Sequence, residues 1–211
     1  QNQPEIWKKT AKYLQVSGFL NYRLTGEFHD SVASQIGYLP FDYKKQKWAK
    51  AFQLPARLFP VEKVKLPKLF QPGECLGTIT KKAFHACGIK EGIPVIACGS
   101  DKGCETLGSG VLSADRVSLS FGTIATIQAV SDRYLELKRF MPAYPAVIPG
   151  WYNPEIEIHR GFWMISWFKK QFARKELEEA EELGIPAEEI LNRCLERTSP
   201  GAMGLMAQPY W

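Results

Sequence analysis

The sequence predicts an α/β fold, because a strand, a helix and a second strand follow one another near its middle. Residues 76–79 have the composition of a strand. Thr80 is suited to cap a helix over residues 81–87, and Gly88 is suited to end it. Residues 93–98 form a short apolar run typical of a buried strand.

Shorter elements are predicted before this unit. Apolar spacing favours a helix over residues 6–14, and a second helix over residues 17–24 is capped by Ser17 and ended by Gly26. Trp48 lies among four lysines, a pattern that predicts the buried side of a helix with solvated lysines around it. Further N-cap candidates are Asp30, Ser31 and Asp42.

The pattern changes at Arg116, and a second domain is predicted to start near residue 113. Alternating apolar residues on both sides of Gly122-Thr123 predict a β-hairpin. Helices are predicted over residues 161–172, over the acidic segment that follows, and over residues 187–196. The apolar run that ends the chain predicts a strand at a point of truncation.

Composition indicates a globular protein, with 45% hydrophobic and 23% charged residues. The formal net charge of +5 is dispersed and no recognition motif accompanies it, so we expect no nucleic-acid partner. No apolar run approaches the roughly 20 residues of a membrane span, and we expect no membrane partner and a cytoplasmic location. Five cysteines without a C-x-x-C pair predict free, mostly buried thiols in a reducing compartment. Three scattered histidines predict no metal site.

Asp101 is the first candidate for chemistry. Aspartate after a strand is a common helix N-cap, and this structural interpretation is favoured on spacing alone. The functional interpretation is that a carboxylate at the carboxyl end of an α/β strand lies where such sheets bind ligands. There it could accept a proton from a substrate hydroxyl. The two interpretations are compatible and both stay open.

Gly122-Thr123 is the second candidate. The structural interpretation is a hairpin turn that uses a permissive glycine. The functional interpretation is a tight loop whose backbone N–H groups and Thr123 hydroxyl face phosphate oxygens. Trp163 and Trp167, on the predicted aromatic helix, are interpreted as core residues.

Five segments, in order, resemble the FGGY carbohydrate kinases, which include glycerol, xylulose, ribulose, rhamnulose, fuculose and gluconate kinases. The segments are FLNYRLTGEFHDSVAS, the later Trp48, PGECLGTITKKAFHACGIKEGIPVIACGSDKGCETLGSG, SLSFGTIATI and PGAMGLMAQPYW. The resemblance covers nearly the whole chain, is weaker between residues 132 and 190, and is most specific between residues 72 and 123.

The resemblance implies a two-domain, actin-like fold with ribonuclease H-like cores, in which ATP with Mg²⁺ meets a sugar or polyol substrate. Residues 1–112 would be the later part of the sugar-binding domain, and residues 113–211 the early part of the nucleotide-binding domain. Asp101 would be the general base. The phosphates would contact Gly122 and Thr123.

The resemblance also implies neighbours for the ligands. Gly161 and Ser166 would lie near the nucleotide. Lys102 stands where the family usually has Asn or Gln beside the sugar, so it is either a solvated lysine or a contact to a negatively charged substrate such as a sugar acid. Ile124 replaces a residue that is commonly small and hydroxylated.

Three family segments have no counterpart in this sequence: the early D-x-G-T loop, the early sugar contacts and the late glycine-rich adenosine loop. We therefore expect an inactive internal fragment with exposed sheet edge and apolar surface, which either self-associates or survives from a longer protein, and a homodimer is one possible partner state. The alternative function is a non-catalytic actin-like nucleotide-binding or regulatory module. A nucleic-acid-binding protein is a third and weaker alternative.

Overall fold

A computed structural model describes residues 3–37 and 39–206 of the chain. The contacts within it form two compact units. The first comprises Gln1–Ser118 with Ile127–Ile156, and the second Leu119–Thr126 with Glu157–Trp211. The predicted division near residue 113 concerns the domains of an intact kinase, and it stays a prediction.

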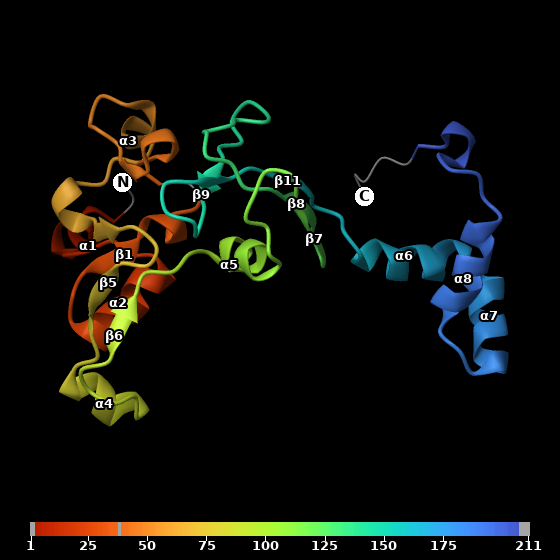
Figure 1. The fold of residues 1–211 in the computed structure, drawn as a ribbon, viewed down its shortest axis with the longest axis horizontal. Helices are drawn as coiled ribbons and strands as arrows, with labels where there is room; N and C mark the ends of the chain where they lie inside the picture. The colour runs from red at the N-terminus through yellow and green to blue at the C-terminus, as the bar shows by residue number, and fades with distance from the viewer. Residues whose placement is uncertain (1–2, 38, 207–211) are drawn as a thin grey trace. The chain divides into compact units, whose positions relative to one another are not determined.

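Two helices open the first unit, α1 (Pro4–Lys9) and α2 (Val16–Thr25) (Figure 1). α1 is shorter than predicted. α2 is confirmed and ends as expected at Gly26, whose φ of 81° is left-handed. Ser17 is not its cap, because the helix begins after Gln15 and the Ser17 hydroxyl bonds elsewhere.

Four pairs of short strands follow among the described residues of the first unit. β1 (His29–Ser31) pairs in parallel with β4 (Lys68–Phe70). The antiparallel pairs are β2 (Phe41–Asp42) with β3 (Lys47–Trp48), β5 (Cys75–Thr78) with β6 (Pro94–Ile96), and β9 (Tyr144–Pro145) with β10 (Tyr152–Asn153). The helix α3 (Leu54–Leu58) and 3₁₀ turns connect several of these strands.

A small core forms around the fully buried Phe41, which Trp48 contacts edge-on at a centroid distance of 5.6 Å. The helix predicted around Trp48 is wrong. Asp42 caps a 3₁₀ turn over Tyr43–Lys45, and the chain then enters β3. Trp48 Nε1 donates to the Pro67 carbonyl at 2.8 Å, which satisfies its N–H inside the protein.

The strand–helix–strand unit at residues 75–96 is confirmed. Thr80 caps α4 (Lys81–Cys87) by accepting a hydrogen bond from the Ala83 N–H, and Gly88 ends it with a φ of 77°. The two strands are antiparallel neighbours. The prediction of a buried strand is wrong for β6 in this chain, because Ile96 is 50% exposed. β5 is the one strand paired with β6 in the described part of the chain.

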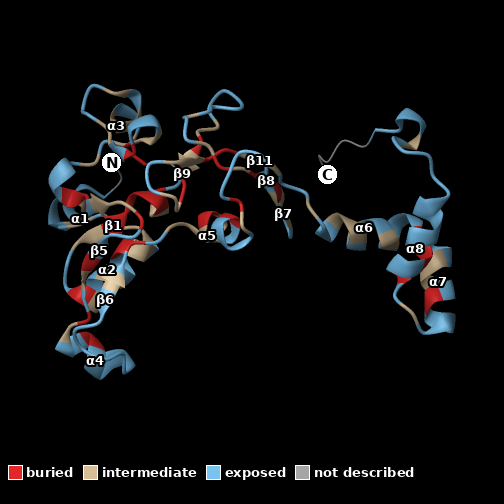
Figure 2. Ribbon diagram, in the orientation of Figure 1, coloured by how far each residue is buried: buried red, intermediate tan, exposed pale blue. Residues whose placement is uncertain are grey.

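The second unit is mainly helical, and most of its helix surface is exposed (Figure 2). α6 (Trp163–Phe172), α7 (Arg174–Leu183) and α8 (Ala187–Glu196) lie close to their predicted positions. Ala180 of α7 and Ile190 of α8 are buried against each other. The predicted terminal strand falls partly on residues 207–211, which lie outside the described residues, and Ala202–Gly204 form a 3₁₀ turn instead.

The predicted hairpin is present where the two units meet along the chain. β7 (Ser118–Phe121), β8 (Ala125–Gln128) and β11 (Glu155–Ile158) form a sheet in the order β11-β8-β7. The helices among the described residues are all too short or too polar to span a membrane.

Candidate functional site

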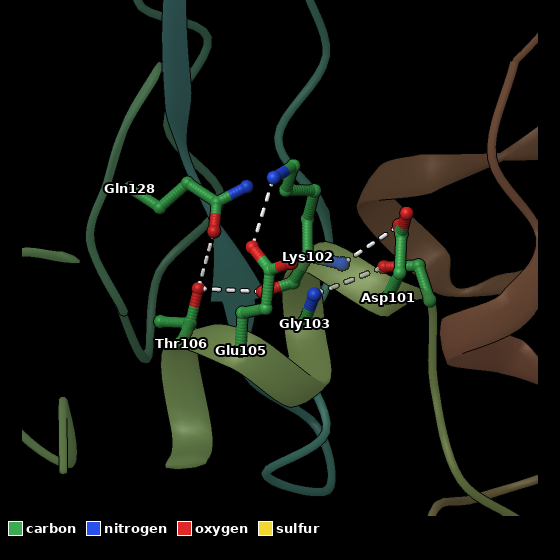
Figure 3. Close-up of polar contacts among 7 residues, drawn as sticks. Asp101, Lys102, Gly103, Glu105, Thr106 and Gln128 are labelled. Carbon is green, nitrogen blue, oxygen red and sulfur yellow. Dashed lines mark hydrogen bonds and ion pairs between the residues drawn. The ribbon is translucent and has the colours of Figure 1, made fainter. Parts of the chain in front are cut away.

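Asp101 is the first residue of α5 (Asp101–Gly108), which follows β6 after a short link. The N-cap of this helix is Ser100, whose hydroxyl accepts the Gly103 N–H at 3.1 Å. The capping interpretation of Asp101 is therefore wrong. The Asp101 carboxylate is exposed, and its Oδ1 accepts the Lys102 N–H at 2.7 Å (Figure 3). Its remaining local role is a favourable interaction with the helix dipole, worth about 0.3–1 kcal/mol.

Glycines on both sides of Asp101 allow α5 to pack closely. A Cβ on Gly103 would lie 3.1 Å from Val147 Cγ2, and one on Gly99 would lie 2.5 Å from the same atom. Further along the helix, the Thr106 hydroxyl donates to Gln128 Oε1 at 2.5 Å (Figure 3). These contacts fix the helix that carries Asp101 within the first unit.

Lys102 reaches along the helix surface. Its Nζ lies 2.8 Å from Glu105 Oε2, in an ion pair three residues apart (Figure 3). The hydrogen bond that Lys102 donates to the Glu105 carboxylate raises the pKa of Lys102, so this side chain is cationic at neutral pH. Sequence spacing did not predict this pairing, although an Asp or Glu three residues from a Lys on a helix is a recognisable signal.

A buried carboxylate that the sequence did not reveal as important lies in β1, at Asp30. Asp30 is 0% exposed. Its oxygens accept hydrogen bonds from Ser17 Oγ at 2.9 Å, Gln35 Nε2 at 2.8 Å and the Ser31 N–H at 2.9 Å. Asn21 Nδ2 donates to it at 3.3 Å. Burial raises the pKa of Asp30, and the donors oppose that rise.

The Gly122-Thr123 turn connects β7 and β8 in the second unit. Gly122 does not have a left-handed φ, and a Cβ placed on it would meet only the Ile124 carbonyl oxygen within 4 Å, at 3.8 Å. Neither backbone conformation nor packing within the described residues therefore requires glycine at position 122. The predicted hairpin turn is present, but Gly122 does not use the left-handed conformation that glycine permits, and close approach of a ligand is a reason for glycine that stays open. Thr123 is exposed beside it.

Gly161, just before α6, contacts this turn through backbone hydrogen bonds. Its N–H donates to the Thr123 carbonyl at 2.8 Å, and the Phe162 N–H donates to the Gly122 carbonyl at 2.8 Å. A Cβ on Gly161 would lie 2.5 Å from the Gly122 oxygen, closer than any relaxed contact. The start of α6 is thus bound to the turn through backbone atoms. Ser166 lies further along α6 with an exposed side chain.

The cysteines differ from expectation in their exposure. All five are free, as predicted, but four of them are exposed and Cys104 is only half-buried. Among residues 3–37 and 39–206 no group of three His, Cys, Asp or Glu side chains is placed to hold a metal ion.

The chain is mixed α/β and matches about 40% of the actin-like, ribonuclease H-like fold of solved sugar kinases. The gluconate kinase of Lactobacillus acidophilus has a structure that superposes with a TM-score of 0.79 at 21% identity, over 100% of this chain and 40% of that one.

The family follows from the sequence matches. The N-terminal domain of the "FGGY family of carbohydrate kinases" matches residues 1–108, and the chain belongs to this family. The uncharacterized sugar kinase YgcE of Escherichia coli K12 is 30% identical over 196 residues, which are 92% of this chain and 40% of that protein. The xylulose kinase of Lactococcus lactis IL1403 is 23% identical, over 100% of this chain and 39% of its own length. The chain thus spans about 40% of the length of these curated relatives.

Proposed function

We propose that the protein containing this chain transfers the γ-phosphoryl group of ATP to a hydroxyl of a sugar, polyol or sugar acid. Membership of the carbohydrate kinase family supports the reaction class. The observation that carries the proposal in this chain is Asp101, an exposed carboxylate at the start of a rigidly packed helix whose cap is a different residue.

Asp101 would act as the general base. The oxygen of the substrate hydroxyl attacks the γ-phosphorus, the bond from that phosphorus to the ADP oxygen breaks, and the hydroxyl proton passes to the Asp101 carboxylate. Because Asp101 is exposed, a substrate hydroxyl can reach its carboxylate. Its fixed place at the helix start would limit the freedom that must be lost before reaction.

The Gly122-Thr123 turn would bind the phosphates of ATP. Space around Gly122 lets a phosphate approach the backbone, and the Thr123 hydroxyl can donate to a phosphate oxygen. Gly161 would support the turn, and Ser166 would lie near the nucleotide. ATP supplies the phosphoryl group, and Mg²⁺ would accompany it on the phosphates, as it commonly does in phosphotransferases.

The domain assignment follows the same proposal. Residues 1–112 would belong to the sugar-binding domain of the intact kinase, and residues 113–211 to its nucleotide-binding domain. The functional experiments below use the full-length protein, meaning a protein of the relatives' length that contains this chain.

A substrate screen tests the reaction class. The full-length protein is mixed with Mg-ATP and a panel of ketoses, polyols and sugar acids, and ADP release is followed by a coupled assay. We expect ADP release that depends on one of these classes. Nucleotide binding without sugar-dependent ADP release would instead identify a non-catalytic actin-like nucleotide-binding module.

A further inference from the structure

The segment Ser31–Ala33 lies against the residues that lead into α5. Ser31 Oγ donates to the Cys98 carbonyl at 2.5 Å, and the Ser100 N–H donates to the Ala33 carbonyl at 3.0 Å. Between these two bonds, a Cβ on Gly99 would come within 3.3 Å of Ala33 Cβ. Residues 98–100, which precede Asp101, are therefore bound at both ends to the segment Ser31–Ala33.

The Ser31 hydroxyl has a fixed direction. The Ala33 N–H donates to Ser31 Oγ at 3.1 Å, which leaves the hydroxyl hydrogen for the Cys98 carbonyl. The backbone of Ser31 is held in turn by the buried Asp30 carboxylate, which accepts its N–H. Ser31 is 1% exposed, so water does not compete for these bonds.

We propose that Ser31 is a positioning residue for Asp101, acting through the Cys98 carbonyl to set where β6 ends and where α5 begins. This inference rests on the proposed function of Asp101 as general base. Asp30 supports it by holding Ser31 and, through Ser17 and Gln35, by anchoring the segment within the first unit.

Loss of the Ser31 hydroxyl removes the bond to Cys98 and leaves a carbonyl without its partner beside a tightly packed glycine. The link from β6 to α5 at Cys98 is then free to shift, and Asp101 shifts with it. A displacement of about 1 Å can cost on the order of a hundredfold in rate. A smaller shift from one lost hydrogen bond should lower kcat by about tenfold.

The experiment compares Ser31→Ala with Thr80→Ala in the full-length protein. Thr80 is a matched control, because its hydroxyl also accepts a capping N–H, from Ala83, and also donates to a distant carbonyl, that of Leu24. Each variant loses a capping hydrogen bond and a hydrogen bond between distant segments. Of the two side chains, Ser31 is the one that contacts the link leading to Asp101, at the Cys98 carbonyl. Thermal unfolding midpoints are measured first, and kcat is then measured well below both.

The expected result is a lower kcat for Ser31→Ala with the KM for ATP unchanged, and a wild-type kcat for Thr80→Ala. The acid limb of the kcat pH profile should also move in Ser31→Ala alone, because the surroundings of the base change. If the two variants have the same kcat and the same pH profile, the inference is wrong and Ser31 is only structural.

A second variant covers the case in which Ser31→Ala does not fold. Ser31→Cys keeps a side chain of similar shape with a weaker donor, and it should show a reduced kcat; a wild-type value overturns the inference. Asp101→Asn is measured in parallel to separate the two hypotheses. If Asp101→Asn is active, the base assignment fails and the inference fails with it. If Asp101→Asn is inactive while Ser31→Ala and Ser31→Cys match wild type, only the inference fails.

Discussion

The start of α5 and the turn after β7 are the two candidate ligand contacts, and they are built differently. Side chains hold the first: Ser100 caps the helix, Ser31 donates to the Cys98 carbonyl in the link between β6 and α5, and Thr106 donates to Gln128. Backbone atoms hold the second, where the Gly161 N–H meets the Thr123 carbonyl. The first region should therefore respond to the loss of a polar group, and the second to the gain of a Cβ.

The two regions also share a feature. In each, the residue proposed to meet a ligand has no sufficient structural reason for its identity. Ser100 rather than Asp101 caps the helix, and Gly122 has neither a left-handed φ nor a close neighbour that excludes a Cβ. In each, an adjacent residue, Ser100 or Gly161, carries the structural role instead. Variants of these pairs can separate function from stability.

The largest expected effect is that of Asp101→Asn. In the full-length protein it should lower kcat by roughly 10²–10⁴, the usual contribution of a general base, with little change in the KM for ATP. Ser100→Ala is the matched control, because it removes the true cap and should cost about 1 kcal/mol of stability. Steady-state kinetics and thermal unfolding of both variants test the assignment.

The comparison predicts opposite outcomes for these neighbours. Asp101→Asn should lose most of its kcat and at most the helix-dipole contribution of about 0.3–1 kcal/mol in stability. Ser100→Ala should lose the stability of the cap and keep more of its kcat. An Asp101→Asn protein with a near wild-type kcat rules out the base. A large loss of stability in that variant would return Asp101 to a structural role.

Gly161→Ala should have the next largest effect, which is a loss of stability at the Gly122-Thr123 turn. The new Cβ would lie 2.5 Å from the Gly122 oxygen and 2.7 Å from the Ala125 nitrogen, which are backbone atoms that cannot rotate away. Overpacking of this kind typically costs about 1–3 kcal/mol. It should also move the turn and raise the KM for ATP.

Gly108→Ala is the control for Gly161→Ala. Gly108 ends α5, and a Cβ there meets nothing within 4 Å, so this change should be neutral or slightly stabilising. Unfolding by denaturant measures the difference. Equal stabilities for the two variants would mean that the close contact at Gly161 is not part of the folded state.

Thr123→Val should have a smaller effect, confined to the nucleotide. A neutral hydrogen bond is worth about 0.5–1.5 kcal/mol, so the KM for ATP should rise by about two- to tenfold. The KM for the sugar should stay unchanged. If ATP titrations of the variant and the wild type superimpose, the turn has no phosphate role.

Much of the fold could be predicted wherever the signals are local. Thr80 and Gly88 mark the ends of α4 because a cap and a left-handed glycine act within one turn of the chain. Trp48 was misassigned because lysines around an aromatic residue fit a helix as well as a short strand. β6 was expected to be buried because its composition suits a central strand, yet in this chain its one described partner is β5.

The candidate site shows the same limit. Asp101 could be singled out from its place after a strand, but whether Asp101 or Ser100 caps the helix depends on one residue of register. Asp30 and Ser31 were recognised only as possible caps, and Ser31 does cap a 3₁₀ turn. Their contacts with Gln35 and Cys98 are tertiary, and no spacing rule predicts them.

Lys102 gives the smallest and last prediction. Its ion pair with Glu105 holds the ammonium group along the helix, yet the side chain is 35% exposed and follows Asp101 directly. If Lys102 assists a sugar acid, the two variants Lys102→Gln and Glu105→Gln should have opposite effects on the KM for that substrate. Lys102→Gln would raise it by removing the cation, and Glu105→Gln would lower it by releasing the cation from its partner. Exposed pairs are worth about 0–1 kcal/mol, so each change should be at most about fivefold. The KM for a neutral sugar should not respond to either variant, and a KM for the sugar acid that both variants leave unchanged would rule out a substrate role for Lys102.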